Sequence, residues 1–407
     1  MLFIASCGKD SPAPAPPPPV PVINTISPIH GPFNTSIIIT GTNFSVTAAE
    51  NIVKVNGKPA TVTNATATQL TVNVPVGAGT GNVSVKVNSS EISGPVFTYE
   101  YTAVVSTVGG TPTSGDFHYP AGVAVDNQDN IYVTDMTLNY IKKISPAGVV
   151  SILAGNGAAG GFVDGTGTAA RFNYPYGLKC DAQGNIYVCD MYNSSIRKVT
   201  PAGVVTTLAG NGVAGYADGT GNSARFNQPT CLTFDGSGNI YIADRWNNRI
   251  RKLTPAGQVS TVVYNSIPPS ASHGLIIDAP GTIFSCLQGD HVVMKYTTDG
   301  NWTEFGTAGN PGFFDSHQSW AKFNGPSDVI KDAQGIIYVA DAANSAIRKI
   351  LPDGQVITIA GNGVQGYMDD AGSAARFKSP IGLALDKNGN LFIADSGNHV
   401  VRKITFK

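Results

Sequence analysis

The strongest constraint on the fold of this chain is a unit of about 54 residues that recurs along most of its length. Successive copies begin 55, 54, 43, 54 and 54 residues apart, at Pro120, Pro175, Pro229, Ser272, Pro326 and Pro380. A repeat of this length with several strands in each copy is the signature of a β-propeller. The repeat therefore predicts an all-β architecture, while the ligand or reaction that it serves must be sought in other features.

Each copy of the unit predicts four short antiparallel strands. In the second copy the apolar runs are separated by turns rich in Gly, Asn and Pro, and they cover Gly177–Cys180, Asn185–Cys189, Ile196–Thr200 and Val204–Ala209. Short apolar runs between turn residues of these types are typical of a β-meander. The second and fourth runs are apolar at neighbouring as well as alternate positions, which is expected of sheets that are buried on both faces between blades.

The two ends of the repeat region predict how the ring closes. The last copy stops at Val401–Lys407, after its third strand, whereas Val104–Gly110 precedes the first copy and reads like the fourth strand Val204–Gly210. An early strand that completes the last blade would remove an open sheet edge. The sequence thus predicts six blades, with the outer strand of the sixth supplied from before the first.

The repeat also resembles a known family. Asn185–Asp190 and Asn193–Lys198 resemble the NHL repeat, and the resemblance spans Val104–Lys407. It implies a six-bladed propeller. NHL-like propellers include a peptidyl-hydroxyglycine lyase with metal-bound histidines, and the related gluconolactonase group holds a metal through carboxylate and amide side chains. The resemblance therefore also implies two kinds of metal-dependent chemistry as alternatives to simple binding.

The segment before the propeller reads as a small β-sandwich. Its short β-rich runs are separated by Gly and Asn turns, as in immunoglobulin-like domains, and they cover Ser36–Thr40, Gln69–Val74 and Asn82–Val87. Ile23–Pro28, Gly31–Pro32 and Ile39–Phe44 resemble the IPT/TIG family of immunoglobulin-like domains. Such modules are spacers or interaction domains, so no chemistry is implied, and His30 is expected to be a loop residue.

The N-terminus resembles that of a bacterial lipoprotein. Ile4–Cys7 is similar to a lipobox, in which small residues precede a cysteine that is lipidated, although the residues before it are too few for a full signal peptide. Lys9-Asp10 is similar to the surface-export signals of Bacteroidota lipoproteins, and a Pro-rich stretch follows. The sequence predicts a truncated signal with lipidation at Cys7 (1–7), a stiff linker (8–21), the IPT/TIG domain (22–102) and the propeller (103–407). We expect a cell-surface lipoprotein of the bacterial outer membrane, attached through its lipid alone.

Charge and composition narrow the classes of partner. The chain has 26 Lys and Arg against 27 Asp and Glu, for a formal net charge of −1, and only 13% of its residues are charged. The basic field that drives nucleic-acid binding is therefore missing, and no nucleic-acid partner is expected. No apolar run is long enough for a transmembrane helix. We expect a monomer whose ligand is a glycan or a protein or peptide.

Charged residues that recur in most copies are expected to hold the fold. The second strand ends in an aspartate, the third carries an Arg-Lys pair, and the long loops carry Asp followed by Ala-Arg-Phe. We expect one member of each Arg-Lys pair to bind an aspartate, the Phe to pack between blades, and the loop Asp to pair with the nearby Arg. The loops lack the oxygen ligands of a calcium site. The strand-ending aspartates are Asp135, Asp190, Asp244, Asp341 and Asp395.

Positions at which the copies differ are the candidates for a site. The residues after the first-strand proline and after the strand-ending aspartate vary from copy to copy and should share one face. The fourth copy departs most, since its preceding loop is shorter by 11 residues (54 − 43), Pro268-Pro269 stands in that loop and Leu287 replaces the aspartate. A missing loop predicts a notch. Aromatic and polar groups around it suit a sugar or a peptide, and the candidates are Tyr176, Met191, Tyr192, Thr230, Arg245, Trp246, His273, Gln288, Asp290 and His291.

Three functions remain open on the sequence alone. The first is non-catalytic binding of a glycan, protein or peptide on the loop-rich face, with no catalytic residue and no cofactor. The second is a metal-dependent hydrolase or lyase in the central funnel, for which His273, Asp290 and His291 are weak ligands for zinc or calcium. The third is a structural scaffold. The cysteines are expected to be buried apolar residues, and Cys189 with Cys231 is the pair to test for a disulfide.

Overall fold

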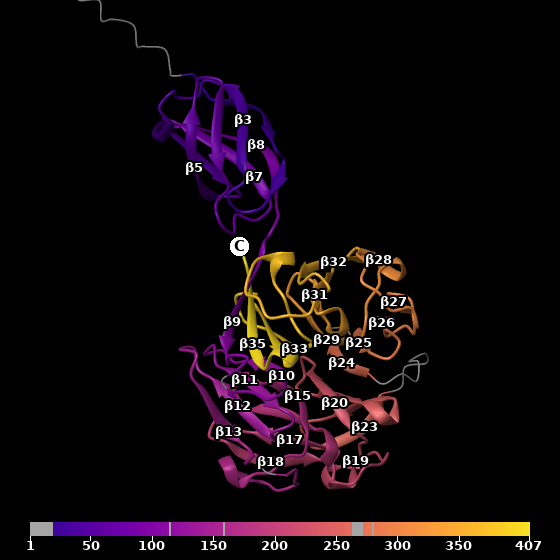
Figure 1. Cartoon of the computed structure of the whole chain (residues 1–407). Helices are drawn as coiled ribbons and strands as arrows, with labels where there is room; N and C mark the ends of the chain where they lie inside the picture. Colours follow the sequence, from indigo (N-terminus) through magenta and orange to yellow (C-terminus); the bar gives the residue numbers. More distant parts are fainter. Residues whose placement is uncertain (1–18, 114, 158, 263–271, 279–280) are drawn as a thin grey trace, which may run out of the picture. The chain divides into compact units, whose positions relative to one another are not determined.

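The computed structural model describes residues 19–113, 115–157, 159–262, 272–278 and 281–407. The chain divides into two compact units, one reaching to Thr102 and the other spanning Ala103–Phe406, and each is described here by itself (Figure 1). Cys7 and the first part of the Pro-rich linker lie outside the described residues. Across the described ranges, no helix has the length and apolarity needed to cross a bilayer.

The first unit is the expected immunoglobulin-like sandwich. Its strands follow one another in the hydrogen-bonded order β1-β3-β6-β5-β4-β7-β8-β2. The three strands expected from the sequence are present as β3, β6 and β7. The elements are β1 (Val22–Ser27), β2 (His30–Gly31), β3 (Ser36–Thr42), η1 (Ala48–Glu50), β4 (Asn51–Val55), β5 (Lys58–Ala65), β6 (Gln69–Asn73), β7 (Gly81–Val87) and β8 (Ser90–Tyr99).

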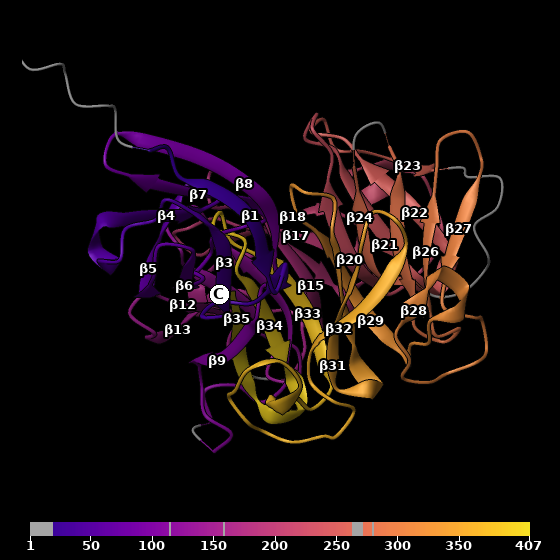
Figure 2. The same cartoon turned by 90° about the horizontal axis from the view of Figure 1, so that it is seen from above.

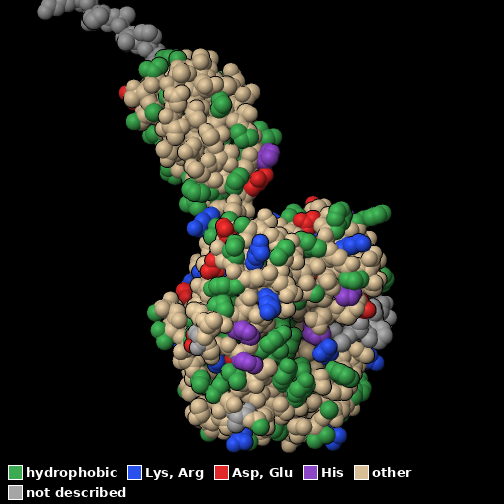
Figure 3. Space-filling view, in the orientation of Figure 1, with side chains coloured by type: hydrophobic (Ala, Val, Ile, Leu, Met, Phe, Trp, Pro, Cys, Tyr) green, Lys and Arg blue, Asp and Glu red, His purple; other side chains and the backbone are tan. Residues whose placement is uncertain are grey.

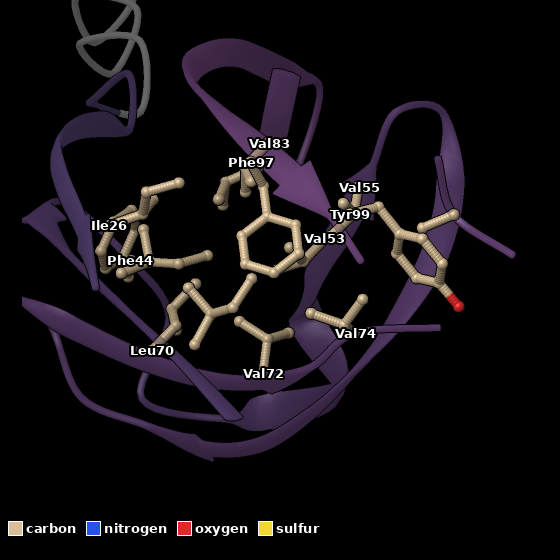
Figure 4. Packing of buried hydrophobic residues seen from close by; sticks show 14 of the residues in the cluster. Ile26, Phe44, Val53, Val55, Leu70, Val72, Val74, Val83, Phe97 and Tyr99 are labelled. Carbon is tan, nitrogen blue, oxygen red and sulfur yellow. The ribbon is translucent and has the colours of Figure 1, made fainter. Parts of the chain in front are cut away.

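Alternating apolar residues build the core of this unit. In β7, for example, Val83, Val85 and Val87 face inward while the residues between them are more exposed. A strand places successive side chains on opposite faces, so this alternation buries one face and leaves the other to water. Figure 4 shows the inward side chains meeting around Phe97. His30 lies on the exposed surface, where its Nδ1 is 2.7 Å from Oε1 of Glu100.

The second unit is a six-bladed propeller in which every blade is an antiparallel meander (Figures 1 and 2). Blade one holds β10 (Pro120–Val125), β11 (Ile131–Asp135), β12 (Tyr140–Ile144) and β13 (Val150–Ala154). Blade two holds β15 (Pro175–Cys180), β16 (Ile186–Asp190), β17 (Ser195–Val199) and β18 (Val204–Ala209). Blade three holds β20 (Pro229–Phe234), β21 (Ile240–Asp244), β22 (Arg249–Leu253) and β23 (Gln258–Val262).

The remaining blades repeat this order. Blade four holds β24 (Ser272–Ile277), β25 (Ile283–Leu287), β26 (Val292–Tyr296) and β27 (Trp302–Phe305). Blade five holds β29 (Pro326–Lys331), β30 (Ile337–Asp341), β31 (Ala346–Ile350) and β32 (Gln355–Ala360). Blade six holds β33 (Pro380–Leu385), β34 (Leu391–Asp395), β35 (Val400–Phe406) and β9 (Ala103–Gly109).

Short elements of the loops complete the ring. Two-residue strands add to the outer edges of blades two, three and five, and single turns of 3₁₀ helix lie in the loops and after the second strands. They are β14 (Gly165–Thr166), η2 (Gly167–Ala169), η3 (Met191–Asn193), β19 (Gly219–Thr220), η4 (Gly221–Ser223), η5 (Arg245–Asn247), β28 (Ser316–His317), η6 (Gln318–Trp320), η7 (Ala342–Asn344), η8 (Gly372–Ala374) and η9 (Ser396–Asn398).

The ring closes as the sequence predicts. β9 lies beside β35 as the outer strand of blade six, with Arg402 opposite Thr107 and Ile404 opposite Val105 (Figures 1 and 2). The apolar sides of both strands enter the core between blades five and six, where Val105 and Ile404 are buried. Residues separated by about three quarters of the chain therefore share one sheet, so the ring cannot open without breaking backbone hydrogen bonds.

The first strands of neighbouring blades approach each other closely at the axis. A Cβ atom on Gly177 would lie 2.3 Å from the carbonyl oxygen of Thr230, and one on Gly382 would lie 2.2 Å from that of Ala121. Glycine at this position of the repeat removes that collision. The close approach of the first strands narrows the centre of the ring.

A buried arginine on the third strand joins a blade to the loop that precedes it. Arg197 of β17 donates to Oδ2 of Asp190 at the end of β16 (2.6 Å) and to Oδ1 of Asp164 in the loop (2.7 Å). The carboxylate of Asp164 also accepts from the amide nitrogen (3.0 Å) and the hydroxyl group (3.0 Å) of Thr207 in β18. We call this set the arginine clasp, and it recurs with Arg251, Arg348 and Arg402.

Aromatic rings and backbone carbonyl groups complete the surroundings of each clasp. The guanidinium of Arg197 lies over the rings of Phe162 and Phe172, 5.1 Å from each ring centre, and donates to two carbonyl oxygens of the loop. Phe172 is the Phe of the Ala-Arg-Phe motif, and it is buried between blades as expected. A buried ion pair offsets the cost of desolvation only when its remaining groups are hydrogen-bonded, which the loop provides here.

The clasp corrects one expectation from the sequence. Asp164 was expected to pair with Arg171, its neighbour in the loop, but it pairs with Arg197 of the blade. The reason is that the loop folds back on itself, with Val163 opposite Arg171, and carries Asp164 over the end of the third strand. The lysines beside the clasp arginines take no part in the clasp, as expected of one member of each pair. Nζ of Lys198, for example, lies 5.5 Å from the ring centre of Tyr187.

Blades one and four show what happens without the long loop. In blade four Leu287 and Met294 occupy the places of the strand-ending aspartate and the arginine, and both are buried in an apolar cluster. In blade one Lys142 replaces the arginine and donates to Asp135 (3.1 Å) and to the carbonyl oxygen of Asp116. Without the loop a buried guanidinium would lose one of its two carboxylate partners and both of its carbonyl partners, so the apolar pair is the stable alternative in blade four.

Removing the arginine of one clasp should destabilise the propeller strongly. Arg251→Met leaves Asp244 buried without its cation, and burial already raises the pKa of that carboxyl group against the opposing effect of Arg251 and the other donors. We expect a loss of about 3–5 kcal/mol in the free energy of unfolding. The double variant Asp244→Leu with Arg251→Met copies the apolar pair of blade four and should recover part of that loss. Denaturant unfolding measures both, and a double variant no more stable than the single one would contradict the clasp as described.

Removing the closing strand should have an equally clear effect. A chain that begins at Ala103 keeps β9 and should show the same cooperative unfolding of the propeller as the full chain. A chain that begins at Thr111 lacks β9, exposes the edge of β35 and uncovers the core around Ile404. We expect it to unfold at a lower temperature or to aggregate, as measured by thermal unfolding and light scattering. Equal stability of the two chains would show that closure contributes little.

Candidate binding face of the propeller

One face of the propeller gathers the variable residues of all the blades. In blade two Pro175 at the start of β15 lies opposite Asp190 at the end of β16. The loop that enters the first strand and the turn that leaves the second strand therefore share one edge of the sheet. The same pairing recurs in the other five blades. We call the surface formed by these loops and turns the loop face.

The centre of this face is a narrow channel. The residue after the opening proline or serine of each first strand is among those that line it, and these six residues are Ala121, Tyr176, Thr230, His273, Ser327 and Ile381. The channel leaves only about 20 Å³ for the centres of water molecules, room for roughly one or two waters. Tyr176, Thr230 and His273, three of the expected site residues, are thus brought together, but a sugar or a peptide side chain does not fit among them.

The carboxyl group of Asp328 and the amine of Lys179 also line the channel. Asp328 accepts hydrogen bonds from the amide nitrogens of Val329 and Leu383, both at 2.9 Å. Burial raises the pKa of Asp328, and the positive charge of Lys179 works against that shift. Nζ of Lys179 lies 3.5 Å from the carbonyl oxygen of Leu383. These groups are engaged with the backbone of the ring, so they stabilise the channel wall.

The rim of the channel is asymmetric. The second residue of each turn after the second strand is small in four blades and a large aromatic residue in the two neighbouring blades two and three. Tyr192 is 49% exposed and Trp246 is 61% exposed. The four small residues at the equivalent positions are Thr137, Gly289, Ala343 and Gly397. Tyr192 and Trp246 thus form an exposed aromatic surface on one side of the rim, which we call the aromatic wall. The turns of the other four blades carry small residues there.

Two further tyrosines, one in the loop before blade two and one at the start of its first strand, make ring contacts. The ring of Tyr174 stacks on that of Tyr192, with ring centres 4.6 Å apart and planes 19° from parallel. Tyr176 meets His273 edge to face, with ring centres 6.2 Å apart. Burial raises the pKa of Tyr174 and Tyr176, so both phenol groups stay protonated at neutral pH. Tyr174 was missed by the sequence analysis because it lies in the loop, one position before the aligned proline.

Arg245 and Met191 occupy the position just before the two exposed aromatics. Burial raises the pKa of Tyr176, and the positive charge of Arg245 works against that shift. Met191 is buried. Arg245 is partly buried, whereas Met191 does not reach the surface.

The candidates of blade four lie in the turn between β25 and β26. Nδ1 of His291 accepts from the amide nitrogen of Gly325 at 3.0 Å, which directs that ring nitrogen into the neighbouring loop. Gln288 lies at the same loop, close to Gly325. The backbone of Asp290 accepts from Gly309. The expected notch involves Pro268-Pro269, which fall outside the described residues.

The two histidines among the weak metal candidates lie in different parts of blade four. His273 lies in the channel wall against Tyr176, while His291 is engaged with Gly325 in the turn of blade four. Among the residues that the structure describes, no three His, Cys, Asp or Glu side chains are close enough to hold a metal ion.

Two histidines that are not among the sequence candidates also meet on this face. The rings of His118 and His399 stack with centres 6.0 Å apart, at the junction of blades one and six. Nδ1 of His118 lies 2.7 Å from Oγ1 of Thr137. Figure 3 shows hydrophobic and histidine side chains gathered around the middle of the propeller. A pair drawn from the two ends of the repeat region is invisible to a blade-by-blade comparison.

The cysteines of the propeller are free thiols. Cys180, Cys189, Cys231 and Cys286 form no disulfide, so the tested pair of Cys189 and Cys231 is not joined. Burial raises the pKa of Cys231 to about 12. Cys189, Cys231 and Cys286 are small buried groups in the core, as expected, whereas Cys180 is only partly buried.

Comparison with known families agrees with this architecture. The IPT/TIG domain family matches residues 21–119, and the NHL repeat family matches residues 117–139, 226–253 and 377–404. The chain is 27% identical over 329 residues to Protein SUPPRESSOR OF QUENCHING 1, chloroplastic, of Arabidopsis thaliana, covering 70% of this chain and 30% of that protein. It is 31% identical over 192 residues to NHL repeat-containing protein 2 of Bos taurus, covering 44% of this chain and 25% of that protein. The chain thus spans less than a third of the length of these relatives.

Solved structures share the fold at low sequence identity. A structural genomics protein of unknown function from Bacteroides thetaiotaomicron has a TM-score of 0.63 at 19% identity, over 97% of this chain and 100% of that one. An auxiliary nutrient binding protein from Bacteroides ovatus has a TM-score of 0.58 at 21% identity, again over 97% and 100%. A virginiamycin B lyase from Staphylococcus aureus has a TM-score of 0.51 at 14% identity, over 75% and 99%. The chain therefore consists of an IPT/TIG domain followed by a six-bladed propeller of NHL repeats.

Proposed function

We propose that the propeller binds a glycan or a peptide, without catalysis, on its loop face. The observation that carries this proposal is the aromatic wall, in which Tyr192 and Trp246 stand exposed on neighbouring turns while the equivalent residues of the other blades are small. Exposed rings supply apolar area with little loss of side-chain freedom, and they stack on the apolar faces of sugars and on peptide side chains.

The geometry of the face favours binding at the rim over binding in the channel. The channel has room for roughly one or two waters. The rings of the aromatic wall, by contrast, are exposed at the rim and accessible to a ligand. Arg245, the residue before Trp246, is partly buried and can donate to a hydroxyl or carboxylate group of the ligand. Stacking on two rings with one charged donor beside them is a common arrangement for recognition without chemistry.

The proposal against catalysis rests on how the titratable groups are used. The strand-ending aspartates of the four clasps are buried against arginines, and Asp328 is held by two amide nitrogens. General acid-base chemistry needs a group that faces the substrate, and these carboxyl groups face the backbone and the clasps. The fold is shared with a lyase as well as with nutrient-binding proteins, so the distinction has to come from an experiment.

We further propose that the protein works at the surface of a bacterial outer membrane. This proposal draws on the lipobox-like Ile4–Cys7, the Pro-rich stretch after it, and a fold shared with auxiliary nutrient binding proteins of Bacteroides. A lipid on Cys7, a stiff linker and the IPT/TIG domain would hold the propeller at a distance from the membrane. Metabolic labelling with a fatty acid tests it, because Cys7→Ser in a full-length precursor should abolish the label.

Loss of the aromatic wall should abolish binding without loss of stability. A screen of the full chain on glycan and peptide arrays should yield ligands whose signal falls at least tenfold in the double variant Tyr192→Ala with Trp246→Ala, since each lost ring contact is worth about 1 kcal/mol or more. Trp320→Ala is the matched control, because Trp320 is also exposed but lies in the loop before blade five. Unchanged binding by the double variant would favour the scaffold instead.

The purified protein should carry no stoichiometric metal, and binding should survive chelation. Elemental analysis after purification measures the first, and the array ligand titrated in the presence of EDTA measures the second. We expect less than about one tenth of an equivalent of zinc or calcium, because the described residues place too few ligands together. The proposal would be contradicted if the protein carried one equivalent of either metal and if His273→Ala lost both the metal and the binding. That result would establish the metal site of the enzymatic alternative.

A further inference from the structure

The outer edge of blade one differs from the covered outer edges of the propeller. In blades two, three and five, a two-residue strand of the preceding loop pairs with the fourth strand. In blade six the amide nitrogen of Val105 donates to the carbonyl oxygen of Asp370 at 2.8 Å, so a loop covers β9 as well. Within the described ranges no strand pairs with the outer side of β13, the last strand of its sheet (Figure 1).

A loop aspartate reinforces each covered edge. The amide nitrogen of Thr207 donates to Asp164 at 3.0 Å, that of Thr358 to Asp315 at 2.9 Å and that of Thr107 to Asp369 at 2.9 Å. In blade three the hydroxyl group of Thr261 donates to Asp218 at 3.0 Å. Ile152 stands at this position in β13. The threonine and its aspartate are therefore absent together from the described residues around blade one.

The strand register shows which backbone groups of β13 point outward. Ile152 lies opposite Lys142 just as Thr207 lies opposite Arg197, with the same register shift before the pair. Because the amide of Thr207 points out toward Asp164, the amide of Ile152 points out as well. The amide of Val150, two residues earlier, does the same, since backbone groups alternate along a strand. β13 thus presents an unpaired row of donors and acceptors beyond the blade.

Apolar side chains of β13 are more exposed than expected for a covered outer strand. Val150 is only partly buried, whereas the equivalent valine of each covered edge is 2% exposed or less, at Val105, Val205, Val259 and Val356. Ile152 is 46% exposed and the preceding Val149 is 63% exposed. An apolar, unpaired strand edge of this kind is a template for the addition of a further strand.

We propose that the outer edge of β13 is a binding site for an extended segment of another protein that carries an aspartate. The chain shows four times what covers such an edge, and in three of these cases the cover is Asp followed by two residues of antiparallel strand: Asp164-Gly165-Thr166, Asp218-Gly219-Thr220 and Asp315-Ser316-His317. A partner segment would pair with Val150 and bring its carboxylate to the amide of Ile152. Lys142 holds the register place of the clasp arginine and is paired with Asp135.

This site is separate from the aromatic wall and does not depend on the proposed function. A synthetic peptide with the sequence of residues 160–169 (Gly-Gly-Phe-Val-Asp-Gly-Thr-Gly-Thr-Ala) serves as the probe, labelled for fluorescence anisotropy. We expect saturable binding to the full chain. The same peptide with Asn in place of the Asp should bind about tenfold more weakly, because it loses the charge of its main hydrogen-bond acceptor.

Three variants of the chain locate the binding. Ile152→Pro removes the outward N–H and should abolish binding, while the inward ladder to β12 keeps its bonds. Ile152→Thr restores the residue of the covered edges and should bind at least as tightly as the unaltered chain, because its hydroxyl group can add the bond seen at Thr207. Trp320→Ala is the control and should bind normally. Circular dichroism and the melting temperature show whether each variant folds. If Ile152→Pro does not fold, the binding of the Asp and Asn peptides to Ile152→Thr is compared in its place.

Three results would overturn the proposal. One is the absence of saturable binding of the Asp peptide to the unaltered chain up to millimolar concentration. Another is equal binding of the Asp and Asn peptides, or binding that a folded Ile152→Pro leaves intact. The third is a concentration-dependent dimer that Ile152→Pro abolishes, since the edge would then pair with a second copy of the chain.

Discussion

The propeller depends on the arginine clasp more than on any other polar interaction. One buried guanidinium binds the end of the second strand, and the loop aspartate bound to it holds the fourth strand through Thr207 or its equivalent. Apolar packing alone does not order loops of this length. The clasp therefore explains why the loops stay fixed on one face, and why Asp, Arg and loop disappear together in blade four, where Leu287 and Met294 are buried instead. The recurring charges hold the fold, and this leaves the varying residues for recognition.

Most of the fold was predictable from the sequence because repetition multiplies a weak signal. Six aligned copies fix the strands to within two residues, and the spare strand at Val104 identifies the closure. The pairing of Asp164 with Arg197 was not predictable, since the partners are 33 residues apart and meet only after the loop folds back. Neighbours in sequence, such as Asp164 and Arg171, are the default expectation, and tertiary geometry overrides it here.

The candidate site was predictable in part. Tyr192 and Trp246 were candidates because the turns after the second strands vary from blade to blade, and the structure leaves both exposed. Met191 varies between blades as well, yet it is buried, because a turn of 3₁₀ helix directs successive side chains to different sides. The narrowness of the channel was hidden too, since it follows from glycines that let neighbouring first strands approach. Tyr174 and His118 lie in the loops before the aligned prolines, and the stacking of His118 on His399 joins the two ends of the repeat region.

The central claim is that recognition belongs to the aromatic wall on the loop face, with the channel and the clasps serving as support. Hydrogen exchange of the full chain, measured by mass spectrometry with and without an array ligand at saturation, tests it most directly. The account predicts that the ligand slows exchange in the turns Met191–Asn193 and Arg245–Asn247 and in the loop before Pro175, and leaves the outer strands unchanged. Protection confined to the turn of blade four, to the outer strands or to the IPT/TIG domain would contradict it.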